Sequence, residues 1–447
     1  MMTSDQPCLG ARWTSAAVIA LSLFALPLRA ETEDPIRTER RRRNEALVKE
    51  GFNLTHGLDV GAAAGERIQG ELLVPPFDGE HLLRFWAEAR VGTVTFRLSS
   101  PSGATVVAWS GRMGETTLRL SLPAGAYAWE VNGTKGGAAH ALLGVRGPVI
   151  ERCEADATLV REQPADPARG FSWPYLLYVP KAARARHLLV VPNNTGFASD
   201  DSELLRASAS CELQRNVWLA EALGAPLLVP LFPRPSEGQG NLYLHALTRA
   251  ALEAKAPAVA RVDLQLGAMF DDARARLAVE EIAVSSRVLL FGFSASGSFV
   301  NRFAVLHPER VLAVAAGSPG GWPLAPVARL GDDTLSWPVG VADLQALTGH
   351  DVDATALKKV SWFFFMGEQD QNDSVPFRDS FSASDQALIF RRFGATPVSR
   401  WRFAERLYAS QGLAARFKLY PGVAHDVTPS MQTDVERLFR GALERGE

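Results

Sequence analysis

The sequence predicts an α/β protein in two parts: a small all-β sandwich, then a larger domain with a mostly parallel sheet covered by helices on both faces. Two observations predict this. Residues 53–146 consist of short runs of alternating polarity, separated by turns that contain Gly, Pro and Asn. Beyond residue 171, near-continuous apolar runs alternate with helical patterns. The 447 residues suit two or three domains.

The strands of the sandwich are expected at intervals of about ten residues. The expected runs are residues 66–74, 80–89, 92–103, 104–111, 116–125 and 126–133. None of them brings a nucleophile close to a base in the sequence. We therefore interpret residues 53–150 as an accessory domain, which either packs as a structural appendage or binds a surface.

A polar stretch rich in Pro and Asp, residues 151–170, is expected to be a linker to the second domain, residues 171–447. Apolar runs mark the expected strands of this domain, at residues 175–180, 186–192, 225–232, 287–293, 311–318, 360–367 and 415–422. Amphipathic stretches between them indicate the crossover helices that a parallel sheet requires.

The first thirty residues have the pattern of an export signal. Arg12 precedes an apolar run of 13 residues, 16–28, and the small residue Ala30 ends the segment. A run of this length is too short to span a bilayer comfortably, so no stable membrane span is expected after its removal. The charged segment that follows, residues 31–52, is expected to be a solvated helix or arm. These features predict a bacterial protein that is secreted or periplasmic.

Composition and charge exclude several classes of protein. Hydrophobic residues make up 47% of the chain and charged residues 21%, which excludes an intrinsically disordered protein. The 47 basic and 49 acidic side chains leave a net charge of -2, and a nucleic-acid partner is not expected.

Of the three cysteines in the sequence, Cys8 would be removed with the export signal. For Cys153 and Cys211 the sequence leaves open a disulfide or two free buried thiols.

The main chemical signal is the segment 287–299, in which a buried strand runs into Gly292-Phe293-Ser294-Ala295-Ser296 before helical periodicity begins. A serine at such a sharp turn has its hydroxyl lifted above the sheet edge, and the residues two positions away must be small. Ser294 is the expected nucleophile, and Ser296 is the alternative in a shifted register. This turn resembles the G-x-S-x-G elbow of the α/β-hydrolase superfamily, with a serine in place of the second glycine.

The resemblance implies an acid and then a histidine later in the chain. Asp370, three residues after Gly367, matches the acid position of the superfamily, and Asp373 is the nearby competitor. His425 matches the histidine of the closing segment. Serine is too weak an acid to attack unaided, so an imidazole must take its proton, and a buried carboxylate must hold that imidazole in one tautomer.

Acyl transfer also needs hydrogen-bond donors for the developing oxyanion. The resemblance assigns one to the backbone N–H of Ala295, and we expect the second from Thr195 or Asn194 in the loop after the strand at 187–191. Trp322 and His245 are expected to line the substrate pocket. No histidine spacing indicates a metal site, and neither a metal nor another cofactor is expected.

The combined pattern resembles secreted bacterial esterases and polyhydroxyalkanoate depolymerase-like serine hydrolases. It implies cleavage of a carboxylic ester through an acyl-enzyme, with polyesters and feruloyl or acetyl esters among the expected substrates. A serine peptidase using the same three residues is the alternative enzyme. A binding protein that kept the fold without activity is the alternative from another class.

Overall fold

The computed structural model describes residues 35–50, 54–60, 67–75, 77–134, 139–147, 149–153, 159–184, 186–194, 200–235, 242–378 and 380–445. The expected export signal, residues 1–30, lies outside these ranges. No helix in the described ranges is both long and apolar enough to cross a membrane.

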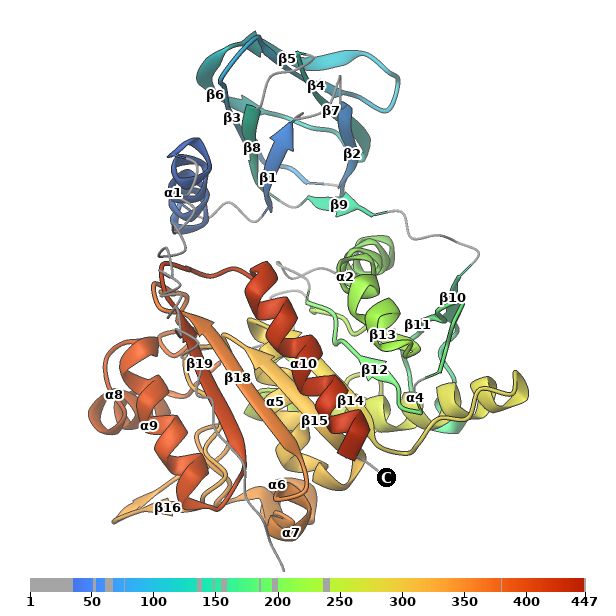
Figure 1. Ribbon diagram of the computed structural model, residues 1–447, viewed down its shortest axis with the longest axis vertical. Helices are drawn as coiled ribbons and strands as arrows, with labels where there is room; N and C mark the ends of the chain where they lie inside the picture. The colour runs from blue at the N-terminus through green and yellow to red at the C-terminus, as the bar shows by residue number, and fades with distance from the viewer. Residues whose placement is uncertain are drawn as a thin grey trace, which may run out of the picture.

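The first part of the chain is a sandwich of two antiparallel sheets (Figure 1). One sheet has the order β1 (Leu54–Val60), β8 (Ala139–Arg146), β3 (His81–Ala89) and β6 (Met113–Leu120). The other has the order β5 (Thr105–Gly111), β4 (Val94–Ser99), β7 (Gly125–Gly133), β2 (Arg67–Val74) and β9 (Ile150–Arg152). The predicted all-β sandwich is confirmed, and each of the six expected runs overlaps a strand.

The core of the sandwich forms because alternate residues of each strand point inward. In β4, for example, Val94, Phe96 and Leu98 are buried and the residues between them are exposed. Phe96 stacks on Phe85 of the facing sheet, with ring centroids 4.4 Å apart. These apolar contacts between the two inner faces hold the sheets together.

The charged segment after the expected signal contains helix α1 (Pro35–Lys49), which packs on this sandwich. Leu47 is buried against Trp86 and Leu142. Arg43 lies over the ring of Trp86, 5.2 Å from its centroid, and forms an ion pair with Glu115. The segment is thus a helix docked by the apolar side chains of Leu47 and Ile36 and by cation–π and ionic contacts.

The second part is built on an eight-stranded sheet. Its order is β10 (Val160–Gln163), β11 (Tyr175–Tyr178), β13 (Leu227–Pro230), β12 (Leu189–Val190), β14 (Val288–Phe293), β15 (Val311–Gly317), β18 (Ser361–Gly367) and β19 (Ala415–Tyr420). β11 is antiparallel to both of its neighbours, and every other pairing in the sheet is parallel. A separate short hairpin is formed by β16 (Arg329–Leu330) and β17 (Asp333–Thr334).

The stretch expected to be a linker, residues 151–170, contains part of this sheet. β9 ends at Arg152 in the sandwich, and β10 already pairs with β11. The polar composition of β10 has a physical reason, since it is an edge strand whose Arg161 and Glu162 are exposed. Among the described residues, regular structure of the second domain therefore begins at Val160.

Helices cover both faces of the sheet, as predicted. The helices of this part are α2 (Ser202–Leu223), α3 (Arg249–Glu253), α4 (Val262–Val279), α5 (Ala295–Leu306), α6 (Leu344–Thr348), α7 (Ala354–Leu357), α8 (Ala383–Arg392), α9 (Pro397–Ser410) and α10 (Pro429–Arg445). Helices α2 and α10 share one apolar cluster with Leu289 of β14, whereas α4, α5 and α9 share the other with Leu290. Successive residues of a buried strand thus face opposite layers.

A disulfide joins the two parts, which settles the alternative that the sequence left open. Cys153 follows β9 of the sandwich, Cys211 lies in the middle of α2, and their Cα atoms are 4.8 Å apart. Leu73 of β2 also packs against Leu204 and Ala207 of α2. The sandwich therefore rests on the N-terminal half of this helix (Figure 1).

We expect the double variant Cys153→Ala/Cys211→Ala to lose about 2–4 kcal/mol of unfolding free energy, because the disulfide closes a 58-residue separation and so restricts the unfolded chain. Urea denaturation followed by tryptophan fluorescence measures this. Dithiothreitol should shift the wild-type transition to the same urea concentration and leave the variant unchanged. An oxidised wild type that unfolds where the variant does would contradict the expectation.

Candidate active site

The turn between β14 and α5 holds Ser294 in a rare backbone conformation, with φ 62° and ψ -123°. Few residues other than glycine adopt such angles, at a cost of about 1–3 kcal/mol, and they gather at functional sites. The turn is tight, because a Cβ on Gly292 would lie 2.3 Å from the carbonyl oxygen of Ser296. The N–H of Ser294 donates to the carbonyl of Gly317 on β15 at 2.9 Å, which ties the turn to the sheet.

Ser296, the alternative nucleophile, has its hydroxyl engaged within the turn. Its Oγ donates to the carbonyl of Phe293 at 2.8 Å and accepts from the N–H of Phe293 at 3.0 Å. The residue is only 2% exposed. These two bonds explain how a serine fits where the related elbow has glycine: the side chain folds back and satisfies the backbone of the turn.

A cavity of about 450 Å³ opens beside Ser294. Its lining comes from β14 and the turn after it, from the segment after β12, from α2, and from α10 with the loop that leads into it. The lining residues are Asn194, Glu212, Arg215, Asn216, Trp218, Phe291, Phe293, Ser294, Ser296, His425, Asp426, Val427 and Gln432. Ser294 and His425, which lie far apart in the sequence, therefore share one cavity.

His425 lies in the loop between β19 and α10, and its Nδ1 is 2.9 Å from Oδ2 of Asp370. The ring of Phe293 packs against the imidazole, with centroids 4.7 Å apart. Asp370 follows β18 and is 2% exposed. Burial favours the protonated acid, but the hydrogen bond with His425, the attraction of the protonated imidazole and the hydrogen bond from the N–H of Asn372 outweigh burial and hold the pKa of Asp370 below its usual value. An ionised Asp370 accepts the proton on Nδ1, so Nε2 is the ring nitrogen that can take up a proton whenever the imidazole carries only one.

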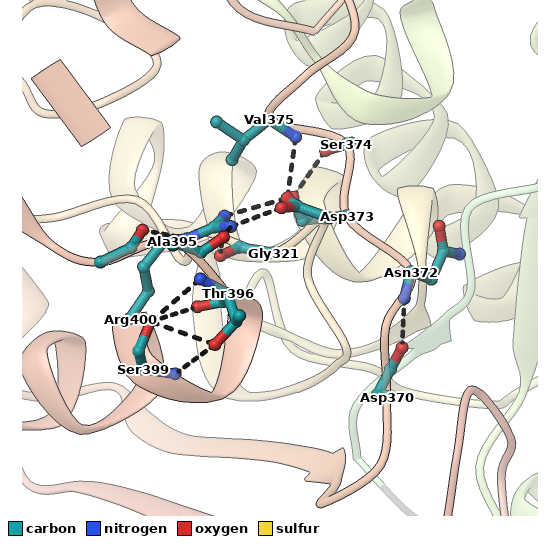
Figure 2. Close-up of polar contacts among 12 residues, drawn as sticks. Gly321, Asp370, Asn372, Asp373, Ser374, Val375, Ala395, Thr396, Ser399 and Arg400 are labelled. Atoms are coloured by element: carbon teal, nitrogen blue, oxygen red, sulfur yellow. Dashed lines mark hydrogen bonds and ion pairs between the residues drawn. The ribbon is translucent and has the colours of Figure 1, made fainter. Parts of the chain in front are cut away.

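Asp373, the competing acid, lies in a different network (Figure 2). Its carboxylate forms a bidentate ion pair with Arg400 of α9, with 2.9 Å between Nη1 and Oδ1. Arg400 is fully buried and also donates to the carbonyls of Gly321 and Gly394, at 2.9 and 3.1 Å. Asp373 thus anchors its loop to α9, whereas Asp370 is the acid that contacts His425.

Asn372 contacts the candidate base and was missed by sequence reasoning. Its Nδ2 lies 2.8 Å from Nε2 of His425, and its backbone N–H donates to Oδ1 of Asp370 at 2.8 Å. The only signal for it in the sequence is its position two residues after Asp370 in a polar loop. Nothing in residue type distinguishes it from Gln371 beside it.

The expected oxyanion donors lie in two places. Ala295 is the first residue of α5, where a backbone N–H has no partner within the helix. Asn194 lines the cavity, and Thr195 lies outside the described residues. The neighbouring Asn193 is fully buried and pairs with the backbone of Phe232, donating to its carbonyl at 2.9 Å and accepting from its N–H at 3.2 Å. This pairing fixes the start of the loop that carries Asn194.

The two residues expected to line the pocket do not line this cavity. Trp322 is 1% exposed, stacks on Phe393 at 4.0 Å and donates to the carbonyl of Val339 at 3.0 Å. His245 is 1% exposed, and its Nε2 is 2.9 Å from the carbonyl of Phe232. Burial lowers the pKa of His245 to about 4, so it is neutral. Both side chains are therefore buried in the protein interior, where they pack against and hydrogen-bond to neighbouring residues.

Two polar residues of α2, Glu212 and Asn216, also line the cavity. Glu212 is half-buried, and burial raises the pKa of its carboxyl. Nδ2 of Asn216, one helical turn further on, donates to Oε1 of Glu212 at 3.1 Å. Across the described ranges, no group of three or more His, Cys, Asp or Glu side chains is arranged to hold a metal ion.

The strand order and the position of the serine turn define the fold class of the second part. Numbered from β10, the strand order 1-2-4-3-5-6-7-8 with the second strand antiparallel, and a serine turn after the fifth strand, is the α/β-hydrolase fold. The fold expected from the resemblance is therefore confirmed.

Solved structures similar to this chain include several hydrolases. Poly(aspartic acid) hydrolase-1 from Sphingomonas sp. KT-1 is 15% identical over 64% of this chain and 97% of its own, with a TM-score of 0.41. LpqC, a poly(3-hydroxybutyrate) depolymerase from Bordetella parapertussis, is 21% identical over 64% and 93%, with a TM-score of 0.41. A thermostable esterase is 12% identical over 88% and 98%, with a TM-score of 0.38. No protein-family model and no curated protein matches the sequence.

We expect Asp373→Asn to lower the free energy of unfolding by about 3 kcal/mol, because it leaves the buried charge of Arg400 without its partner. Urea denaturation measures the loss. Asp351→Asn makes the same chemical change at an exposed position and should stay within about 0.5 kcal/mol of wild type. Equal stability of the two variants would contradict a supporting role for the ion pair.

Proposed function

We propose that the chain is a serine hydrolase that cleaves carboxylic esters through an acyl-enzyme. The observation that carries this proposal is the strained backbone of Ser294 in the lining of a cavity that His425 also lines. Nδ1 of His425 is hydrogen-bonded to the buried, ionised Asp370. A folded chain keeps such strain where it positions a reacting group.

In the proposed first step, Oγ of Ser294 attacks the ester carbonyl carbon while its proton passes to Nε2 of His425. The C–O bond to the alcohol then breaks, and the imidazolium returns the proton to the leaving oxygen. Water repeats the sequence on the acyl-enzyme and releases the acid. Asp370 stays ionised throughout and stabilises the imidazolium, a role that its lowered pKa supports.

The oxyanion formed in each step needs donors that are already in place. The N–H of Ala295 at the start of α5 is one proposed donor, and the helix N-terminus adds a favourable dipole. The loop of Asn194 and Thr195 is proposed to supply the second. Its fixed base at Asn193 supports this assignment.

The cavity wall supports a substrate with a short, polar acyl group. Glu212, Arg215, Asn216, Asp426 and Gln432 all line it. A long alkyl chain gains free energy only by leaving water for an apolar surface, at about 0.8 kcal/mol per methylene. Trp218, Phe291, Phe293 and Val427 add apolar lining to the same cavity, and the polar side chains offer hydrogen bonds to hydroxyl or carbonyl groups. This mixture suits hydroxy-acid esters and short oligomers of them.

We also propose that the protein is exported. The disulfide between Cys153 and Cys211 supports an oxidising compartment, because cytosolic thiols are kept reduced. The pattern of residues 1–30 gives the same prediction independently.

We expect a fluorophosphonate to label wild-type protein on Ser294, with loss of fluoride and transfer of the hydroxyl proton to His425. Ser294→Ala should abolish labelling and lower turnover on the order of 10⁶-fold, because the nucleophile acts as a unit with its base. Ser296→Ala is the matched control and should still be labelled. Peptide mass mapping locates the tag. A folded wild type that takes no tag would instead favour the binding-protein alternative.

For substrates, we expect a higher kcat/KM for p-nitrophenyl 3-hydroxybutyrate than for p-nitrophenyl butyrate, since the added hydroxyl meets polar side chains in the cavity. The kcat/KM values for both should exceed the value for p-nitrophenyl palmitate by more than about tenfold. A tenfold ratio corresponds to only about 1.4 kcal/mol of transition-state free energy. Steady-state kinetics on purified protein measures these values. A preference for palmitate would contradict the polar subsite, and faster cleavage of peptide anilides than of esters would favour the peptidase.

A further inference from the structure

The loop after β18 brings an exposed carboxamide to the nitrogen that the proposed mechanism needs. Nδ2 of Asn372 lies 2.8 Å from Nε2 of His425. In the described part of the chain, the hydrogen bond to Nε2 comes from Asn372 and not from Ser294. The same lone pair must accept the proton of Ser294 before attack, so the two side chains compete for one site.

Asn372 can donate a hydrogen bond to His425 only if Nε2 carries no proton. Asp370 is ionised and lies 2.9 Å from Nδ1, so the proton of the neutral imidazole is on Nδ1 and Nε2 is an acceptor. The amide nitrogen of Asn372 only donates. This contact therefore stabilises neutral His425 and is lost, or requires a turned amide, when the imidazole takes a second proton.

Asn372 can leave Nε2 without any movement of its loop. On one side, the N–H of Gln369 donates to the carbonyl of Val423 at 2.9 Å, and Asp370 holds His425. On the other side, Asp373 is bound to buried Arg400. Between these anchors Asn372 is exposed, and its backbone N–H stays on Asp370 (Figure 2). Rotation of an exposed side chain takes picoseconds to nanoseconds.

We propose that Asn372 is a removable cap on the catalytic base: it occupies Nε2 of His425 at rest and must rotate away before Ser294 can transfer its proton. This inference rests on the proposed function of Ser294, His425 and Asp370. The cap lowers the reactivity of the resting site, because the free energy needed to break its hydrogen bond to His425 adds to the activation free energy of acylation. No covalent step involves Asn372 itself.

The cap has a consequence for pH dependence. The charged or titratable groups around His425 are Asp370 at its Nδ1, Asp426 next to it in the chain, and Glu212 and Arg215 of α2, which line the same cavity. Removing the amide leaves all of these in place and takes away a donor that favours the neutral imidazole. The acid limb of kcat/KM, which reports the free enzyme's base, should then move to higher pH.

The test compares wild type with Asn372→Ala, Asn372→Asp and the control Gln371→Ala, an exposed neighbour in the same loop. For each we would measure the second-order rate of fluorophosphonate labelling and the pH profile of kcat/KM for a short ester. Above the acid limb, Asn372→Ala should react about two- to tenfold faster, the range expected for one hydrogen bond. Its acid limb should rise by about half a pH unit to one unit.

The aspartate variant separates a cap from a general loosening of the loop. Its carboxylate accepts from the imidazolium, so the acid limb should rise further than in Asn372→Ala, and the rate at neutral pH should fall. Gln371→Ala should match wild type in both measurements. Labelling of Asn372→Ala at or below the wild-type rate, with an unmoved acid limb, would overturn the cap. Absence of labelling in every folded variant would instead overturn the proposed function.

Discussion

The close approach of backbone segments around Ser294 is the constraint on which the rest of the site depends. Gly292 leaves room for the carbonyl of Ser296, and a Cβ on Gly297 would lie 2.3 Å from the carbonyl oxygen of Gly317. Only with both glycines can α5 start directly at the end of β14 and pack against β15. The strained angles of Ser294 follow from this packing, and so do the positions of its hydroxyl and of the first N–H of the helix.

Sequence reasoning recovered the features that rest on periodicity and on strict local sterics. Apolar runs identified the parallel strands because residues buried on both faces leave little choice of side chain. The elbow was recognisable because few residues tolerate its turn. Chain order then pointed to Asp370 and His425, and these two residues contact each other in the structure.

Features that depend on tertiary surroundings could not be predicted in this way. β10 is polar because it is an edge strand, and so its sequence resembled a linker. Trp322 lies after β15, where a pocket wall was expected, but Phe393 from a distant segment covers its ring. The roles of Asp370 and Asp373 differ because two residues far along the chain select between them: His425 contacts Asp370, and buried Arg400 pairs with Asp373. For Asn372 the sequence offers only its position two residues after Asp370 in a polar loop.

The disulfide keeps the two halves of the chain covalently linked even if the chain is cut between its two cysteines. Cys153 and Cys211 enclose the segment that contains β10, β11 and β12, and the residues before it form the sandwich. A protease that cuts one peptide bond inside this segment would produce two polypeptides, but they would still migrate as one molecule until a reductant is added. In an environment rich in proteases, the sandwich would thus remain tethered to helix α2, whose Glu212 and Asn216 form one wall of the cavity.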